Sequence, residues 1–247
     1  MASLRQPTTI WVPVDGLPVR TGFRRQGVQD QVGPRDEYPG GANAPGQRCE
    51  KDLPGNSEDQ MPRLGVVIAS TREGRVGAPV AEWFLGQARQ HGGFEVELLD
   101  LAAVNLPLLS EPNHPRLKRY TQDTTKAWSA TVDALDAFVI VTPEYNFSSP
   151  PALVNALDHL YNEWNYKAAG FVSYGGISGG LRSVQTTKLL LGALKMVPIV
   201  EAVTIPFVAR ELQDGRFPGT EKANASATTM LDELLRWTTA LAALRTP

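Results

Sequence analysis

Beyond residue 61, the apolar positions alternate between short continuous runs and longer segments with helical spacing. The first run covers 64–69 and has the length and composition of a buried strand. The segment after it opens at Pro79, a residue favoured in the first turn of a helix, and carries Phe84 and Ala88 one turn apart. Such alternation is typical of βαβ units wound around a parallel sheet.

The second run has a different pattern. Phe94, Val96 and Leu98 alternate with Glu95 and Glu97, so apolar and charged side chains fall on opposite faces of a strand. This pattern predicts a half-exposed strand at an edge of the sheet. Three further strands are predicted at 137–141, 168–173 and 199–203, and further helices at about 128–135, 152–160, 181–196 and 230–241.

An exposed second strand beside buried first, third and fourth strands fits the strand order 2-1-3-4-5 better than a six-stranded dinucleotide-binding sheet. The prediction is an α/β domain over 61–247, built on a five-stranded parallel sheet. In such a sheet, ligands bind beyond the carboxyl ends of the strands, at the switch point between the first and third. The loops after strands one, three and four are therefore the candidate functional segments.

Residues 1–60 show no helical or strand periodicity and are rich in Gly, Pro, Gln, Asp and Arg. We expect a disordered leader, because such a segment buries too little apolar surface to offset its ordering entropy. Two interpretations stay open. The leader is either a regulatory or targeting tail, or translated sequence upstream of a native start at Met61.

Charge and cysteine content narrow the functional classes. Lys and Arg number 24 against 26 Asp and Glu, so no global field favours nucleic acid or an anionic membrane as a partner. Cys49 is the only cysteine, which excludes an internal disulfide, and the three histidines have no metal-ligand spacing. The chain has neither a membrane-length apolar run nor a secretory signal pattern, so we expect a cytoplasmic protein.

The loop after the first strand combines hydroxyl, guanidinium and glycine groups at the start of a helix. Ser70, Thr71, Arg72 and Arg75 lie between the strand and Gly77. Free backbone N–H groups and the helix dipole attract an anion there, and arginine adds charge-assisted bonds. The loop predicts a phosphate cradle, with a solvated, capped turn as the alternative. It matches neither the G-x-G-x-x-G nor the P-loop pattern.

The other two loops offer contacts for a flat ring. After the third strand, Pro143 stiffens a segment whose Tyr145 and Phe147 would border such a ring, although an ordinary strand-to-helix loop is the alternative. After the fourth strand, the glycines within 173–180 let the backbone approach a ligand closely.

The glycine segment also satisfies G-x-S-x-G around Ser178, the nucleophile elbow of α/β-hydrolases. That interpretation needs a histidine after the serine. His91, His114 and His159 all precede it, so we set the hydrolase aside.

With these motifs in order, the chain from about residue 61 onward resembles the NADPH-dependent FMN reductases, a flavodoxin-like group that includes quinone, azo and chromate reductases. The resemblance rests on Ser70 and Arg72, on 143–146 with the helix at 155–158, and on the 173–180 loop. It implies a three-layer α/β sandwich. By the same resemblance, the FMN phosphate would contact Ser70, Thr71, Arg72 and Arg75. One edge of the isoalloxazine would contact Pro143, Glu144, Tyr145 and Asn146. The other edge would contact Ser173, Tyr174, Gly175 and Gly176.

The chain departs from the commoner family pattern at three positions in the first loop. Ala69 stands where glycine usually precedes the serine, and Arg75 and Gly77 stand where a serine and an asparagine are frequent. Phosphate binding is therefore expected more of Arg72 than of Arg75.

The resemblance also implies a chemistry. FMN would be the cofactor and NADPH or NADH the co-substrate, with hydride passing from nicotinamide to flavin and on to a flavin or quinone-like small molecule. Because the cofactor carries this chemistry, no catalytic side chain is predicted. A homodimer or homotetramer is implied as well. The alternative is a flavodoxin-like electron carrier or a nucleotide-binding protein without turnover.

Overall fold

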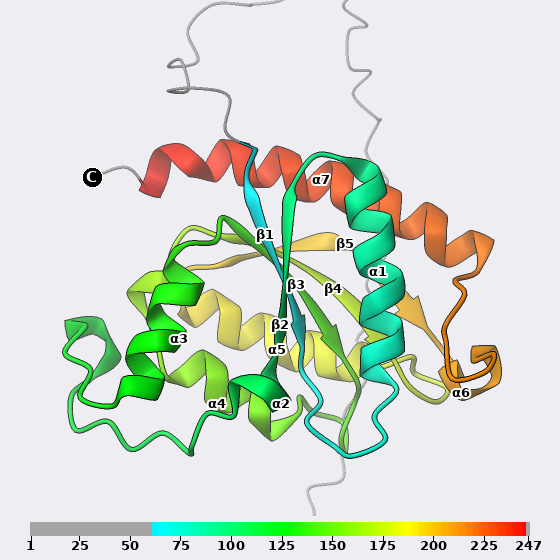
Figure 1. Cartoon of the computed structure of the whole chain (residues 1–247). Helices are drawn as coiled ribbons and strands as arrows, with labels where there is room; N and C mark the ends of the chain where they lie inside the picture. The colour runs from blue at the N-terminus through cyan, green and yellow to red at the C-terminus, as the bar shows by residue number, and fades with distance from the viewer. Residues whose placement is uncertain (1–60, 246–247) are drawn as a thin grey trace, which may run out of the picture. The chain divides into compact units, whose positions relative to one another are not determined.

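The computed structural model describes residues 61–245, so the predictions for 1–60 lie outside the described part of the chain. Its five strands are all parallel and have the order β2-β1-β3-β4-β5 (Figure 1). The predicted α/β class and flavodoxin-like strand order are confirmed. The strands are β1 (Arg63–Ile68), β2 (Glu95–Asp100), β3 (Ala137–Thr142), β4 (Ala168–Tyr174) and β5 (Val197–Ile205).

Helices cover both faces of the sheet and make a three-layer sandwich (Figure 1). On one face, α1 (Gly77–His91) and α7 (Glu221–Arg245) share an apolar core with the strands. On the other face, α3 (Asp123–Asp133), α4 (Pro151–Asp158) and α5 (Leu181–Ala193) enclose a second core. No helix within 61–245 is long and apolar enough to cross a membrane.

The burial of each strand follows its sequence pattern. Every residue of β3 and β4 is buried, as expected of continuously apolar central strands. The alternating strand β2 lies at an edge, where Leu98 is 43% exposed, so the predicted edge strand is confirmed. The opposite edge is β5, whose pairing with β4 shifts register between Ala169 and Phe171.

Several element boundaries differ from the predicted ones. Helix α1 begins at Gly77, two residues before Pro79, and α7 begins at Glu221 rather than near 230. The first turns of α7 bury Ala223 and Ala227, side chains too small to give a strong apolar signal. The structure adds four short elements: α2 (Leu101–Val104), α6 (Val208–Glu211) and the 3₁₀ turns η1 (Pro115–Leu117) and η2 (Asn162–Trp164).

Candidate functional site

Residues from or next to the three candidate loops meet at the carboxyl edge of the sheet. Ser70 directly follows β1 and is 2% exposed, and its Oγ lies 2.6 Å from the Oη of Tyr145 in the β3–α4 loop. Tyr174, the last residue of β4, also interacts with the Ser70 hydroxyl. Burial raises the pKa of Tyr174 well above its usual range, so this hydroxyl stays protonated and neutral. A hydrogen bond between hydroxyl groups thus joins the loops after β1 and β3, and Tyr174 lies near it at the end of β4.

The start of α1 has the properties of an anion site. Its N-cap residue, Val76, makes no side-chain capping bond, and no acidic residue lies in the first turn. Backbone N–H groups at this end of the helix therefore keep their capacity to bind an anion. Arg72 is exposed in the loop that leads into this helix, with its guanidinium carbon 5.9 Å from the centre of the Tyr145 ring. The predicted phosphate cradle would lie at this end of the helix.

Arg75 and Thr71 occupy different positions from Arg72. The Arg75 guanidinium forms an ion pair with Asp100 at the end of β2, and both side chains are largely buried. Its charge is thereby partly neutralised, which makes Arg72 the better candidate for a phosphate. Thr71 is exposed and faces a groove described below.

The β3–α4 loop contains a tight turn. The backbone N–H of Tyr145 donates to the Ser148 carbonyl over 3.0 Å, and the reverse bond has the same length. Asn146 and Phe147 between them both have positive φ, 50° and 68°, as a type I′ turn requires. Positive φ is rare for a bulky residue such as Phe147, whose side chain is 66% exposed. The turn therefore holds an aromatic side chain in the solvent at the edge of the site.

Glu144 connects this loop to the start of α5. Its Oε1 lies 2.6 Å from Nη2 of Arg182, and its Oε2 accepts hydrogen bonds from Ser178 Oγ at 2.9 Å and from the Arg182 backbone at 3.1 Å. The Arg182 guanidinium also lies 3.7 Å from the centre of the Phe147 ring. The Glu144 carboxylate is thus fully engaged within the protein. A ligand in this loop would find the backbone of 143–146 and the Tyr145 ring instead.

The sequence did not identify Arg182, because it lies 38 residues after Glu144 and no local motif links the two. Its place two residues after the glycine loop is the one signal that would have suggested it.

The glycine loop divides into a packed half and an open half. A Cβ on Gly179 would lie 2.5 Å from the Thr204 side chain, and one on Gly180 would lie 2.8 Å from the Tyr174 carbonyl oxygen. These two glycines serve the packing of the loop on β4 and β5. A Cβ on Gly176 would meet nothing within 4 Å. A Cβ on Gly175 would lie 3.2 Å from the Gly180 backbone nitrogen, so the open part of the loop, which a ligand can reach, is at Gly176.

Ser173, the remaining predicted residue of this loop, is fully buried at the end of β4. Its Oγ has no hydrogen-bond partner in the described residues. Buried hydroxyls normally have a partner, so this orphaned group fits a site completed by a ligand or an ordered water.

The arrangement around Ser178 does not suit a hydrolase. The Ser178 hydroxyl donates to a carboxylate of Glu144, and each histidine is engaged elsewhere: His91 with Asp232, His114 with the backbone of Arg116, and His159 with Thr125 and Pro107. Within 61–245, no three His, Cys, Asp or Glu side chains are grouped as metal ligands would be.

A groove of about 460 Å³ lies beside Thr71, between α2 and the start of α4. One wall is the 105–109 segment, which Asn155 fixes from α4. Its Oδ1 accepts from the Leu109 N–H and its Nδ2 donates to the Pro107 carbonyl, both over 2.9 Å. We call this space the neutral groove, because every side chain lining it is uncharged: Thr71, Leu101, Ala102, Asn105, Leu106, Leu108, Pro151, Ala152 and Asn155.

The residues present fit FMN. The uncapped start of α1 with Arg72 suits a phosphate, and the orphaned Ser173 hydroxyl with the open space at Gly176 suits the edge of a ring. Fold and site together define a flavodoxin-like protein, a class in which a mononucleotide binds at the β1/β3 switch point.

Comparison with known proteins identifies the family within this class. The chain belongs to the NADPH-dependent FMN reductase family, whose model matches residues 62–210. The protein is therefore an oxidoreductase that uses FMN with NADPH or NADH.

Curated relatives agree with this assignment, and a solved structure shares the fold. An NAD(P)H-dependent FMN reductase of Schizosaccharomyces pombe is 40% identical over 149 residues, covering 59% of this chain and 74% of that protein. A second, from Saccharomyces cerevisiae, is 33% identical over 155 residues, covering 58% and 81%. The flavoenzyme NAD(P)H:(acceptor) oxidoreductase FerB of Paracoccus denitrificans has the same fold, with a TM-score of 0.60 at 20% identity over 72% of this chain and 98% of that one.

Proposed function

We propose that this protein passes hydride from a nicotinamide nucleotide to bound FMN and on to a flavin or quinone-like acceptor. The observation that carries the proposal is the uncapped start of α1 beside Arg72, joined through Ser70 and Tyr145 to the loops that would hold the ring. When bound, FMN supplies the redox chemistry itself. The side chains of the protein need only bind, orient and shield.

Each loop has its own part in this proposal. Ser70, Thr71 and Arg72 bind the phosphate, and Arg75 contributes less because Asp100 neutralises it. The backbone of 143–146 binds one edge of the ring, in a position fixed by the bonds of Glu144 to Arg182 and Ser178. Ser173 to Gly176 border the other edge.

The neutral groove supports an uncharged acceptor. Its lining of leucine, alanine, proline, threonine and asparagine has no ionised side chain to repel or attract charge. A flat, uncharged ring such as a quinone would bury apolar surface there without stripping water from a charge.

A homodimer or homotetramer is part of the same proposal. Leu108 is 82% exposed at the rim of the neutral groove, and Leu109 beside it is 40% exposed. A second subunit covering these side chains would also wall the groove. Sedimentation equilibrium of the full chain measures the assembly, and a monomer at all concentrations would contradict it.

The function is tested by mixing the FMN-loaded protein with NADPH without oxygen. We expect the flavin absorbance near 450 nm to bleach within seconds and to return when a quinone or free flavin is added. Steady NADPH oxidation with these acceptors would follow. A bound flavin that NADPH does not reduce would favour the electron carrier and contradict the proposal.

A further inference from the structure

Phe207 lies two residues after the end of β5, next to the glycine loop. Its backbone N–H donates to the Gly176 carbonyl at 3.0 Å, and the N–H of Val208 donates to the Gly175 carbonyl at 3.2 Å. The start of α6 is therefore fixed to the part of the glycine loop that a ring can reach. Figure 1 shows α6 at the same lower edge of the molecule as the β1–α1 loop.

The backbone of Phe207 has a conformation that bulky residues rarely adopt. Its φ is 51° and its ψ 35°, in the left-handed region. Such strain persists only where the surroundings fix it, and it concentrates at functional sites. Here it leaves the Phe207 ring 42% exposed beside the site.

Arg210 covers that ring with an unpaired charge. Its guanidinium carbon lies 4.8 Å from the centre of the Phe207 ring. Glu211 and Asp214 are close in the chain, yet among the described residues no carboxylate lies within ion-pair distance of Arg210. We call Phe207 and Arg210 together the α6 corner. It offers an aromatic face and a free guanidinium, the two groups that bind a base and a phosphate.

Charge at the rest of this edge is already committed. Arg75 is paired with Asp100 and Arg182 with Glu144, while Arg72 stands at the phosphate cradle. The neutral groove has no cation in its lining. A second phosphorylated ligand at this edge would find exposed guanidinium groups without an ion pair among the described residues at Arg210 and at Arg216, and of these two Arg210 lies over an aromatic ring.

We propose that the α6 corner binds the adenosine end of the nicotinamide nucleotide. The Phe207 ring packs against the adenine, and Arg210 binds the 2′-phosphate that NADPH has and NADH lacks. This inference rests on the proposed function, because the nicotinamide must reach the ring between the β3–α4 and glycine loops. From there the α6 corner is the adjoining surface, because its backbone is bonded to the glycine loop. The consequence is a preference for NADPH that one side chain controls.

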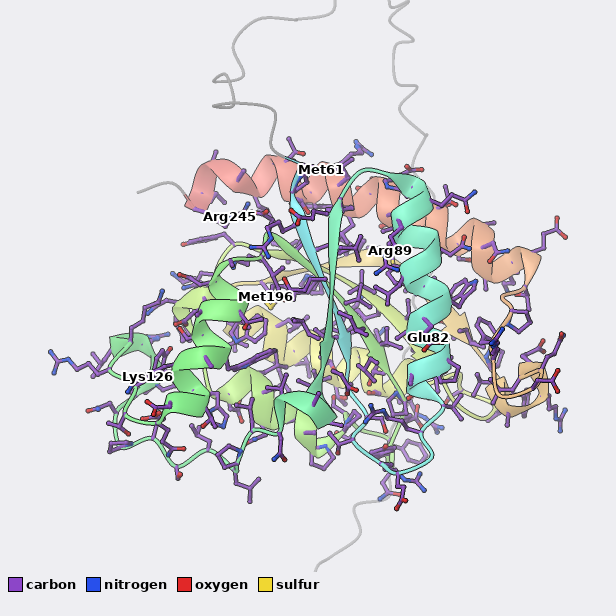
Figure 2. All side chains as sticks on the ribbon, in the orientation of Figure 1. Met61, Glu82, Arg89, Lys126, Met196 and Arg245 are labelled. Carbon is purple, nitrogen blue, oxygen red and sulfur yellow. The ribbon has the colours of Figure 1, made fainter. Side chains whose placement is uncertain are left out.

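The test compares Arg210→Ala with a matched control, Arg89→Ala. Arg89 is an exposed arginine toward the far end of α1, labelled in Figure 2. A lost bond to a charged phosphate at an exposed site weakens binding by roughly tenfold. We expect Arg210→Ala to raise the KM for NADPH by about that factor, with the KM for NADH and the kcat unchanged within about twofold. Arg89→Ala should change neither.

Binding of 2′,5′-ADP, measured by calorimetry on the FMN-loaded protein, gives a readout independent of turnover. Arg210→Ala should weaken it by about tenfold and leave 5′-AMP unaffected. Phe207→Gly keeps the left-handed backbone accessible while removing the ring, and should weaken both ligands alike.

Equal effects of Arg210→Ala on NADPH and NADH, or no effect on either, would overturn the inference. A wild-type protein that oxidises neither nucleotide would instead contradict the proposed function. The two failures are thus distinguishable.

Discussion

The absent side chain of Gly77 makes room for the hydroxyl of Tyr174. A Cβ at Gly77 would lie 2.6 Å from the Tyr174 Oη, closer than the two atoms can approach. The first residue of α1 and the last residue of β4 therefore fix each other at the point where the phosphate cradle meets the glycine loop.

Gly77→Ala should accordingly lower the free energy of unfolding by about 1–3 kcal/mol, as overpacking does, and weaken FMN binding. Gly86 on the same helix is the matched control, since a Cβ there would meet nothing within 4 Å. Gly86→Ala should be neutral or stabilise by up to about 1 kcal/mol. Adding Tyr174→Phe to Gly77→Ala removes the clashing atom and should restore stability. Denaturant unfolding measures all four proteins, and equal behaviour of the two alanine variants would refute the steric argument.

The hydrogen bond between Ser70 and Tyr145 predicts coupling between two loops that lie 75 residues apart. In a double-mutant cycle with Ser70→Ala and Tyr145→Phe, the effects on the free energy of unfolding should differ from additivity by about 0.5–1.5 kcal/mol. Denaturant unfolding of the four proteins gives this coupling energy. Additivity within about 0.3 kcal/mol would mean that the bond does not contribute in solution.

Replacing Ser178 distinguishes the reductase interpretation from the hydrolase interpretation. Its hydroxyl donates to Glu144 and has no histidine partner, so Ser178→Ala should leave NADPH oxidation within a few-fold of wild type. The protein should cleave no p-nitrophenyl ester. An esterase activity that Ser178→Ala abolishes would reverse the assignment.

The lowered pKa of Glu111 predicts that this residue contributes to the stability of the fold in a pH-dependent way. Burial alone would raise its pKa, but hydrogen bonds from Thr121 and Gln122 at the start of α3 lower the pKa from 4.5 to about 2. The carboxylate form is thus favoured by folding. Its contribution is fully present above about pH 4.5 and is lost as the pH falls toward 2.

Glu111→Gln should therefore lower the Tm at neutral pH, modestly because the carboxylate is exposed to solvent screening, and the difference from wild type should shrink at about pH 3. Glu82→Gln, on the exposed face of α1 (Figure 2), is the control and should show no such trend. A Tm difference that is constant with pH would contradict the role of the charge.

The strand order could be predicted because the apolar pattern of each strand indicates how deeply that strand is buried. Continuous apolar runs mark β1, β3 and β4 as central, and the Glu95 to Leu98 alternation marks β2 as an edge. Periodicity fails where elements are short, so α2 and α6, with four residues each, were not predicted. The position of the loops at the carboxyl edge followed from topology alone.

Contacts between distant side chains could not be predicted in the same way. The ion pair of Arg75 with Asp100 and that of Glu144 with Arg182 join residues whose proximity depends on the folded sheet. The sequence therefore identified Arg75 and Glu144 as site residues without showing that the protein engages their charges. The roles of the individual site residues in binding FMN stay predictions.

Binding of the FMN phosphate by the β1–α1 loop is tested by Arg72→Ala with two ligands. Riboflavin has the same ring as FMN and lacks the phosphate. Titrating both into wild-type and variant protein gives four dissociation constants. We predict that FMN binding weakens by roughly ten- to a hundredfold while riboflavin binding stays unchanged. Equal losses for both ligands, or an unchanged affinity for FMN, would mean that Arg72 does not bind the phosphate.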